Sequence, residues 1–88
     1  MDNDESLLEF PCDFPIKAFG ADDGEFEAAV VELVRTHAPD AAIEAVHSRT
    51  SRAGTYRSVT VNVRATSRDQ LDAIYHALTA DERVLMAL

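Results

Sequence analysis

The sequence predicts a single α+β domain in which a four-stranded antiparallel sheet carries two helices on one face. Stretches with strand-like alternation and stretches with apolar residues at helical spacing follow the order strand, helix, strand, strand, helix, strand. This order is the split βαβ arrangement of ferredoxin-like βαββαβ sandwiches. The length of 88 residues suits one domain spanning 1–88. One predicted strand has a valine face and a polar face, as expected where helices cover only one side of a sheet.

The first predicted strand runs from Phe14 to Gly20, after an acidic N-terminal lead-in over residues 1–13. Pro11 and Pro15 bracket the entry to this strand, and a proline favours extended backbone at the residue before it. The alternation places Lys17 and Phe19 on the face opposite the core.

The first predicted helix runs from about Gly24 to His37, after a turn over Gly20–Gly24. We expect Asp22 or Asp23 to cap its N-terminus and Pro39 to end it. Its apolar stripe comprises Phe26, Val30, Leu33, Val34 and His37.

A weak alternation over residues 42–48 predicts the second strand, and a polar loop from Ser48 to Thr55 predicts a hairpin. The third strand, Tyr56–Ala65, has the clearest pattern in the chain. Its predicted inward residues are Val59, Val61, Val63 and Ala65, and its outward residues are Ser58, Thr60, Asn62 and Arg64.

Ser67 to Gln70 form a capping-box sequence, which predicts the start of the second helix. The apolar stripe of that helix comprises Leu71, Ile74, Tyr75 and Leu78. Arg83–Leu88 is predicted as the last strand, with Val84, Met86 and Leu88 pointing inward. Leu85 and Ala87 then join Phe19 on the open face, and a partly apolar open face predicts self-association or a protein partner.

The net charge of −8 is unevenly distributed along the chain. Five of the eight basic residues lie between Arg49 and Arg68, a window without Asp or Glu, so that window carries +5 and the remainder carries −13. A solvated basic hairpin would explain this cluster, which is also the region where an anionic partner could dock. The overall negative charge disfavours duplex DNA and anionic membranes as partners.

The residue types used in catalysis form no recognisable constellation. Cys12 is the single cysteine and lies in an acidic segment, which favours the neutral thiol. The separations of His37, His47 and His76 do not match metal-ligand spacing. Carboxylates crowd the start of the first helix, so an amine fits there better than an anion. The sequence therefore predicts no enzyme activity, no metal and no cofactor.

RNA-binding RRM domains share this order of elements, but they stack bases on aromatic residues of the third strand. Here that strand offers one aromatic residue, Tyr56, at its very start. Binding of RNA or another polyanion through the Arg49–Arg68 region is therefore the alternative to a protein-interaction role.

Several blocks along the chain resemble the YbeD-like family of small bacterial proteins. This resemblance implies a ferredoxin-like fold similar to ACT regulatory domains, which bind small effectors at paired interfaces. It also implies a regulatory link to lipoate metabolism, because genes of the family lie near those for lipoyl-protein assembly in some bacteria. The blocks are Leu7-Leu8-Glu9-Phe10-Pro11, Phe14-x-x-Lys17-x-x-Gly20, Val30-Val31, Val34, His37-Ala38-Pro39, Gly54-x-Tyr56-x-Ser58-Val59-Thr60-Val61, Tyr75-x-x-Leu78 and Val84-x-Met86-x-Leu88.

Taken together, the sequence predicts a non-enzymatic, ACT-like regulatory or protein-interaction module. The expected partner is a second copy of the chain or another protein, and a small-molecule effector fits the same role. The acidic N-terminus lacks the features of a signal peptide and no apolar run reaches membrane-span length, which predicts a cytoplasmic location. The candidate ligand- or partner-binding residues are Arg49, Arg52, Arg57, Arg64, Tyr56, Phe19 and Leu85.

Overall fold

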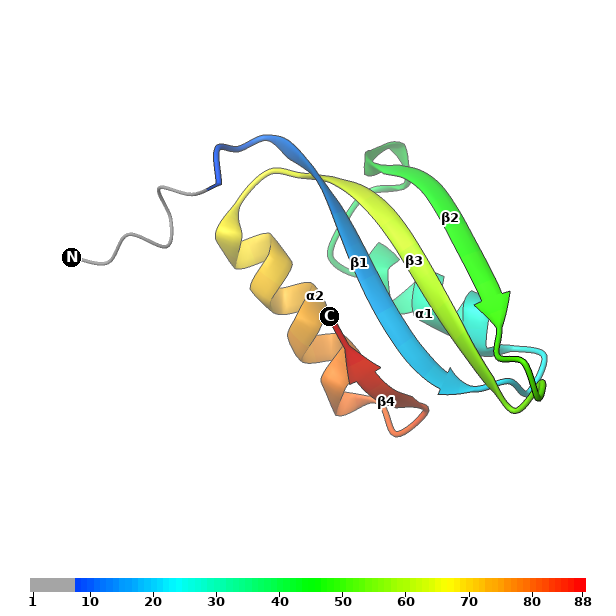
Figure 1. Ribbon diagram of the computed structural model, residues 1–88. Coiled ribbons are helices and arrows are strands. Elements are labelled where there is room, and N and C mark those ends of the chain that lie inside the picture. The colour runs from blue at the N-terminus through cyan, green and yellow to red at the C-terminus, as the bar shows by residue number, and fades with distance from the viewer. Residues whose placement is uncertain (1–7) are drawn as a thin grey trace.

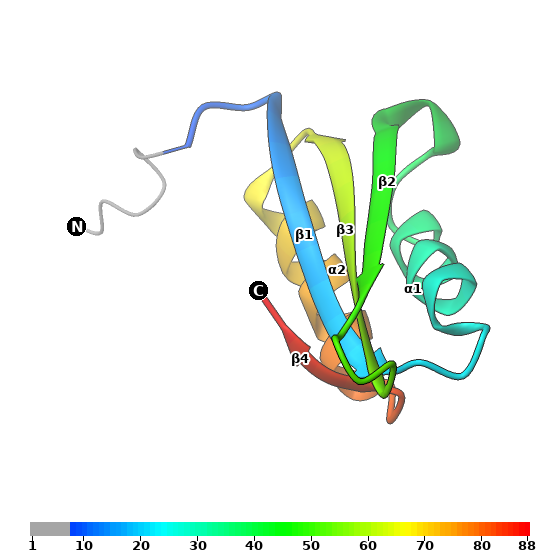
Figure 2. The ribbon, with the colours of Figure 1, turned by 45° about the vertical axis from the view of Figure 1, so that its right-hand side comes forward.

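A computed structural model of the chain describes residues 8–88 and confirms the predicted α+β fold (Figure 1). The four strands form one sheet in the order β2-β3-β1-β4, and all neighbouring strands are antiparallel. Both helices lie on the same side of this sheet (Figure 2), and the opposite side, here called the open face, carries neither helix. No helix among residues 8–88 is long and apolar enough to cross a membrane.

The buried core lies between the helices and the sheet. It contains no polar or charged residue among those described, as expected where each polar group stays within reach of water or a partner. The core residues are Ile16, Ala18, Phe26, Val30, Val34, Ala38, Val59, Val61, Val63, Ala65, Leu71, Ile74 and Leu78.

Strand β1 comprises Cys12–Ala21 and is longer at both ends than predicted. It pairs with β3 along its whole length, from Cys12 opposite Ala65 to Ala21 opposite Tyr56, so the partner strand sets its extent. The turn predicted from Gly20 therefore begins only at Asp22. Of the predicted lead-in, residues 1–7 lie outside the described part of the chain.

Helix α1 comprises Phe26–Arg35 and is shorter than the predicted Gly24–His37. Asp23 does not cap it in the usual way: its carboxylate accepts a hydrogen bond from the backbone N–H of Glu25 at 2.9 Å. The assignment of His37 to the apolar stripe is wrong. Because the helix ends before this residue, His37 is exposed and the next residue, Ala38, faces the core.

A short 3₁₀ helix, η2 (Asp40–Ala42), precedes strand β2, which comprises Ile43–Thr50. Strand β3 comprises Tyr56–Ala65, as predicted, and its inward valines are fully buried. The hairpin loop between β2 and β3 is residues 51–55, shorter than predicted because β2 extends further. Gly54 in this loop has φ 76°, a conformation that glycine adopts without steric cost.

Helix α2 comprises Arg68–Ala80 and begins as its capping sequence predicts. The Ser67 hydroxyl accepts a hydrogen bond from the Gln70 N–H at 3.0 Å. The Gln70 side-chain oxygen accepts from the N–H of Thr66 at 2.7 Å, one residue further back than in the usual capping box. Its amide nitrogen donates to the carbonyl of His37 at 3.0 Å, which joins the start of α2 to the segment that follows α1.

Strand β4 comprises Val84–Ala87, and its predicted alternation is wrong. Val84 lies opposite Gly20 but Met86 lies opposite Phe19, so Leu85 is the extra residue of a bulge. One extra residue reverses the faces of all residues beyond it. Ala87 consequently packs against the core, whereas Leu85, Met86 and Leu88 are exposed by 64%, 53% and 59%.

Strands β2 and β4 are the edges of the sheet, and β4 covers only part of β1. Lys17 exchanges both backbone hydrogen bonds with Leu88, so its peptide groups point toward β4. The direction of the peptide groups alternates along a strand, so Pro15, two residues before Lys17, also faces the β4 side of β1. Proline has no N–H, so this position offers no backbone donor along that edge.

Candidate functional site

The open face carries a shallow groove of about 520 Å³ where β1, β2 and β3 lie side by side. We call it the open-face groove. It is lined by Lys17, Phe19, His47, Arg49, Ser58 and Thr60, with Ser48 at its edge. A smaller depression of about 190 Å³ adjoins it, shares Phe19, Arg49 and Ser58, and extends to Tyr56.

The strand register explains why these side chains meet. Arg49 lies opposite Ser58, Ser58 opposite Phe19, and Phe19 opposite Met86, which makes one row across all four strands. A second row runs from His47 through Thr60 to Lys17. Residues opposite one another on neighbouring strands project from the same face. The rows therefore place cationic, hydroxyl and apolar side chains beside each other.

Two side chains that line the open-face groove, Lys17 and Arg49, are cationic although the whole chain is acidic. Within residues 8–88, Lys17 and Arg49 form no salt bridge. Arg64, near the other end of β3, pairs with Asp13 at 3.1 Å. The groove thus holds two cationic side chains that are not neutralised by a carboxylate of the described chain.

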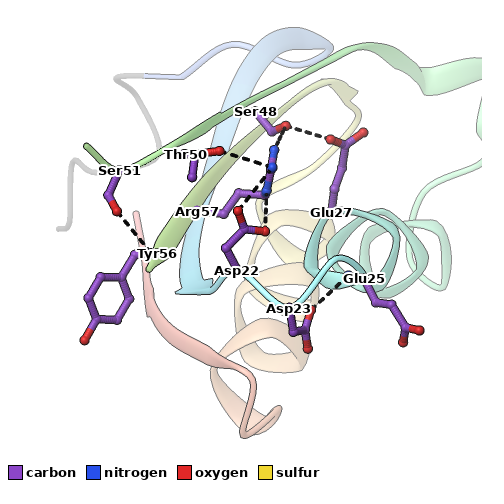
Figure 3. Close-up of polar contacts among 9 residues, drawn as sticks. All are labelled: Asp22, Asp23, Glu25, Glu27, Ser48, Thr50, Ser51, Tyr56 and Arg57. Atoms are coloured by element: carbon purple, nitrogen blue, oxygen red, sulfur yellow. Dashed lines mark hydrogen bonds and ion pairs between the residues drawn. The ribbon is translucent and has the colours of Figure 1, made fainter. Parts of the chain in front are cut away.

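Arg57 lies opposite Thr50 and next to Ser58, the partner of Arg49, so Arg57 and Arg49 project from opposite sides of the sheet. Arg57 belongs to a group of polar side chains here called the Arg57 network (Figure 3). Its guanidinium donates to both carboxylate oxygens of Asp22, at 3.0 and 3.3 Å. It also donates to the hydroxyls of Ser48, at 2.7 Å, and Thr50, at 3.2 Å. Ser48 in turn donates to the Glu27 carboxylate at 2.7 Å. The network ties the β1–α1 loop and the first turn of α1 to the β2–β3 hairpin, which is a structural role.

The predicted site residues therefore divide into groups. Arg49 and Phe19 come together at the open-face groove, and Tyr56 lines the smaller depression beside it. Arg57 and Arg64 are paired with Asp22 and Asp13. Arg52 is exposed in the hairpin loop. Leu85 is exposed in the β4 bulge.

Sequence reasoning did not select several groove residues. Lys17 alternates with Phe19 on β1, and that spacing alone places the two side chains on one face. The other residues depend on strand register, which the sequence does not show. They are His47, Ser58 and Thr60.

Cys12 is partly buried in β1. Among residues 8–88 no three His, Cys, Asp or Glu side chains gather as a metal site would require. In the same range, no buried side-chain polar atom lacks a hydrogen-bond partner.

Asp22→Asn is expected to make the free energy of unfolding fall less steeply as the pH is lowered. The hydrogen bond from Arg57 lowers the pKa of the Asp22 carboxyl below its usual 3.8. Because the folded-state pKa is the lower one, the ion pair stabilises the fold above about pH 4. That stabilisation is lost as the pH falls through the folded-state pKa. Urea unfolding at several pH values between about 6 and 2 measures this slope.

Some acid sensitivity should remain in the variant, because Arg83 lowers the pKa of Asp81 to about 2 through side-chain and backbone hydrogen bonds. Glu82→Gln, an exposed change in the turn between α2 and β4 at a residue that forms no salt bridge within residues 8–88, is the control. If the free energy of unfolding fell as steeply with pH in Asp22→Asn as in the unchanged protein, the assigned role of the Arg57 network would be contradicted.

Comparison with known proteins places the chain among small bacterial proteins. Residues 5–88 match the model of a family described as "Protein of unknown function (DUF493)". A "UPF0250 protein" of Neisseria gonorrhoeae is 48% identical over 87 residues, which covers 99% of this chain and 96% of the relative. "UPF0250 protein NE1487" of Nitrosomonas europaea is 46% identical over 85 residues, with 97% and 98% covered.

A solved structure shares the fold. The solution structure of protein HP0495 from H. pylori matches 100% of this chain and 94% of its own, with a TM-score of 0.73. The sequence identity of 15% limits this likeness to the fold. It agrees with the predicted ferredoxin-like arrangement of the sheet and helices.

Proposed function

The chain belongs to the DUF493 family, in agreement with its resemblance to YbeD-like proteins, and we propose that it is a non-enzymatic protein-interaction module. Its binding surface is the open face of the sheet, centred on the open-face groove. The regulatory and lipoate-linked part of this role is supported by the family resemblance alone.

The observation that carries the proposal is the row of residues that joins Arg49, Phe19 and Met86 across the open face. Helices cover the apolar side of the sheet, so the apolar residues of this row are not needed for the core. Met86 is 53% exposed, and the neighbouring Leu85 and Leu88 are exposed to a similar degree. Exposed apolar side chains rimmed by polar ones are typical of protein-interaction surfaces.

Binding of RNA or another polyanion through the Arg49–Arg68 region has less support. Arg57, Arg64 and Arg68 of this region pair with carboxylates of the chain. Pairing reduces the positive charge that a phosphate backbone would meet, and phosphate contacts supply most of the non-specific affinity for nucleic acids. Arg49 and Arg52 remain, and they are few for a polyanion site.

An affinity experiment with matched variants tests the proposal. The full chain is immobilised and exposed to native bacterial lysate, and retained proteins are quantified by mass spectrometry. We expect a defined set of proteins whose retention falls at least about tenfold with Met86→Ser, because covering an exposed apolar side chain contributes to affinity and serine removes that contribution. His76→Ser, exposed on α2, is the control and should retain the same set.

Two further measurements accompany this experiment. Light scattering on a sizing column, from low to high micromolar protein, shows whether the open face binds a second copy. A thermal-shift series with lipoate tests the effector role. Retention that is equal for wild type, Met86→Ser and His76→Ser, together with a monomer at all concentrations, would contradict the proposal.

A further inference from the structure

We propose that the occupant of the open face is an acidic protein segment that also carries an apolar side chain. The inference rests on the proposed function and specifies the chemistry of the partner. It draws on the charge and the strand register of the open-face groove and on the exposed apolar residues of β4 beside it.

Charge complementarity selects an acidic partner. Lys17 on β1 and Arg49 on β2 stand on either side of β3. With neighbouring strands about 4.8 Å apart, their strands are separated by about 10 Å. Both lack a carboxylate partner within residues 8–88. A segment laid along β3 would bring its carboxylates within reach of both cations.

The floor of the groove fits the same ligand. Ser58 and Thr60 of β3 lie between the two cations, and their hydroxyl groups can donate hydrogen bonds to a carboxylate. His47 lies opposite Thr60 on the outer strand and adds a third nitrogen-bearing side chain. Carboxylates held by charged donors form stronger hydrogen bonds than neutral acceptors do.

At the Phe19 end of the groove, an apolar group on the partner would fit best. Phe19 is partly buried, and Met86 beside it is half exposed. A leucine or aromatic side chain of the partner can cover both. Such burial contributes affinity, whereas exposed charge pairs mainly contribute specificity and association rate.

A second copy of this chain is a poorer match at the same face. Two open faces placed against each other would oppose the cations of one copy to those of the other, and like charges across an interface cost affinity. RNA is also a poorer match, because single-stranded RNA is recognised by stacking its bases on aromatic side chains, and of Phe, Tyr and Trp residues the open-face groove offers Phe19 alone for this purpose.

Three fluorescein-labelled peptides test the inference by fluorescence anisotropy against the full chain. The first alternates glutamate and leucine, the second alternates glutamine and leucine, and the third contains glutamate with serine in place of leucine. We expect the first to bind at least about tenfold more tightly than either of the others. The second peptide lacks the carboxylates, and the third lacks the apolar side chains. Amide shifts should map the first peptide to Lys17, Phe19, Arg49 and Ser58.

Charge-reversal variants locate the site. Arg49→Glu and Lys17→Glu should each weaken binding of the first peptide by about fivefold or more. Arg68→Glu makes the same charge change on the helix side, at the start of α2, where a carboxylate suits the helix dipole. It should leave the affinity within about twofold.

Equal affinity for the glutamate and glutamine peptides, an equal effect of Arg49→Glu and Arg68→Glu, or tighter binding of an oligouridine probe would each overturn the inference. The proposed function would survive any of these results if Met86→Ser still abolished retention of lysate proteins. It would fall with the inference only if that retention were also independent of Met86.

Discussion

Gly20→Ala is expected to lower the free energy of unfolding by about 3 kcal/mol, because the position has no room for a methyl group. A Cβ built on Gly20 would overlap the backbone carbonyl oxygen of Arg83 and the ring of Phe26, whose Cζ atom would lie 2.6 Å away. The ring is buried and the carbonyl belongs to the chain entering β4, so neither can move without displacing its neighbours. Urea unfolding followed by circular dichroism measures the change.

Gly24→Ala separates crowding from backbone conformation. Gly24 has φ 86° and open space where a Cβ would stand, so alanine there meets only the cost of left-handed backbone, about 1 kcal/mol. If Gly20→Ala proved no more destabilising than Gly24→Ala, the close contact of β1 with Phe26 and Arg83 would be wrong.

Phe26→Ala is expected to lower the free energy of unfolding by about 3–5 kcal/mol. Phe26 is the first residue of α1, is only 1% exposed and is the largest fully buried side chain of the core. Removing its ring leaves a cavity between α1 and β1. For a domain of this size such a loss is a large part of the total stability, and it is measured by the same urea titration.

Tyr56→Ala is the matched control, since it removes an aromatic side chain that is 52% exposed at the start of β3. We expect a change of less than about 1 kcal/mol. Phe26→Leu, which keeps most of the apolar volume, should fall between the two. Similar losses for Phe26→Ala and Tyr56→Ala would contradict the assignment of Phe26 to the core.

The elements with a strong local signal were predictable from the sequence. β3 has uninterrupted alternation of valines with polar residues, and the structure gives it the predicted bounds. The Ser67 cap of α2 depends only on residues within one helical turn, and it forms as predicted. The order of these elements then fixes the fold, because few arrangements join them without crossing connections.

β4 was not predictable in detail. The last five residues of the chain, 84–88, are all apolar, so the sequence contains no alternation that could reveal which face each side chain takes. The bulge at Leu85 arises from pairing with β1, close to the crowded contact at Gly20. Register and packing between distant segments decide this strand.

The candidate site was predicted in part. A count of arginines along the chain treats Arg49, Arg57 and Arg64 as one group, but Arg57 and Arg64 are an odd number of residues apart in one strand and face opposite sides. Arg57 consequently meets Asp22, which lies far away in sequence. Lys17 belongs to the groove only because β1 lies next to β3, a neighbour relationship that the strand order establishes.

The proline of β1 has a consequence for how copies of this protein can accumulate at high concentration. Sheet edges with free peptide groups act as templates on which further chains add, and repeated addition leads to fibres. On the described part of the chain, β4 leaves the outer side of β1 uncovered around Pro15, and a residue without an N–H interrupts that template. Growth by strand addition is therefore hindered at this part of the β1 edge.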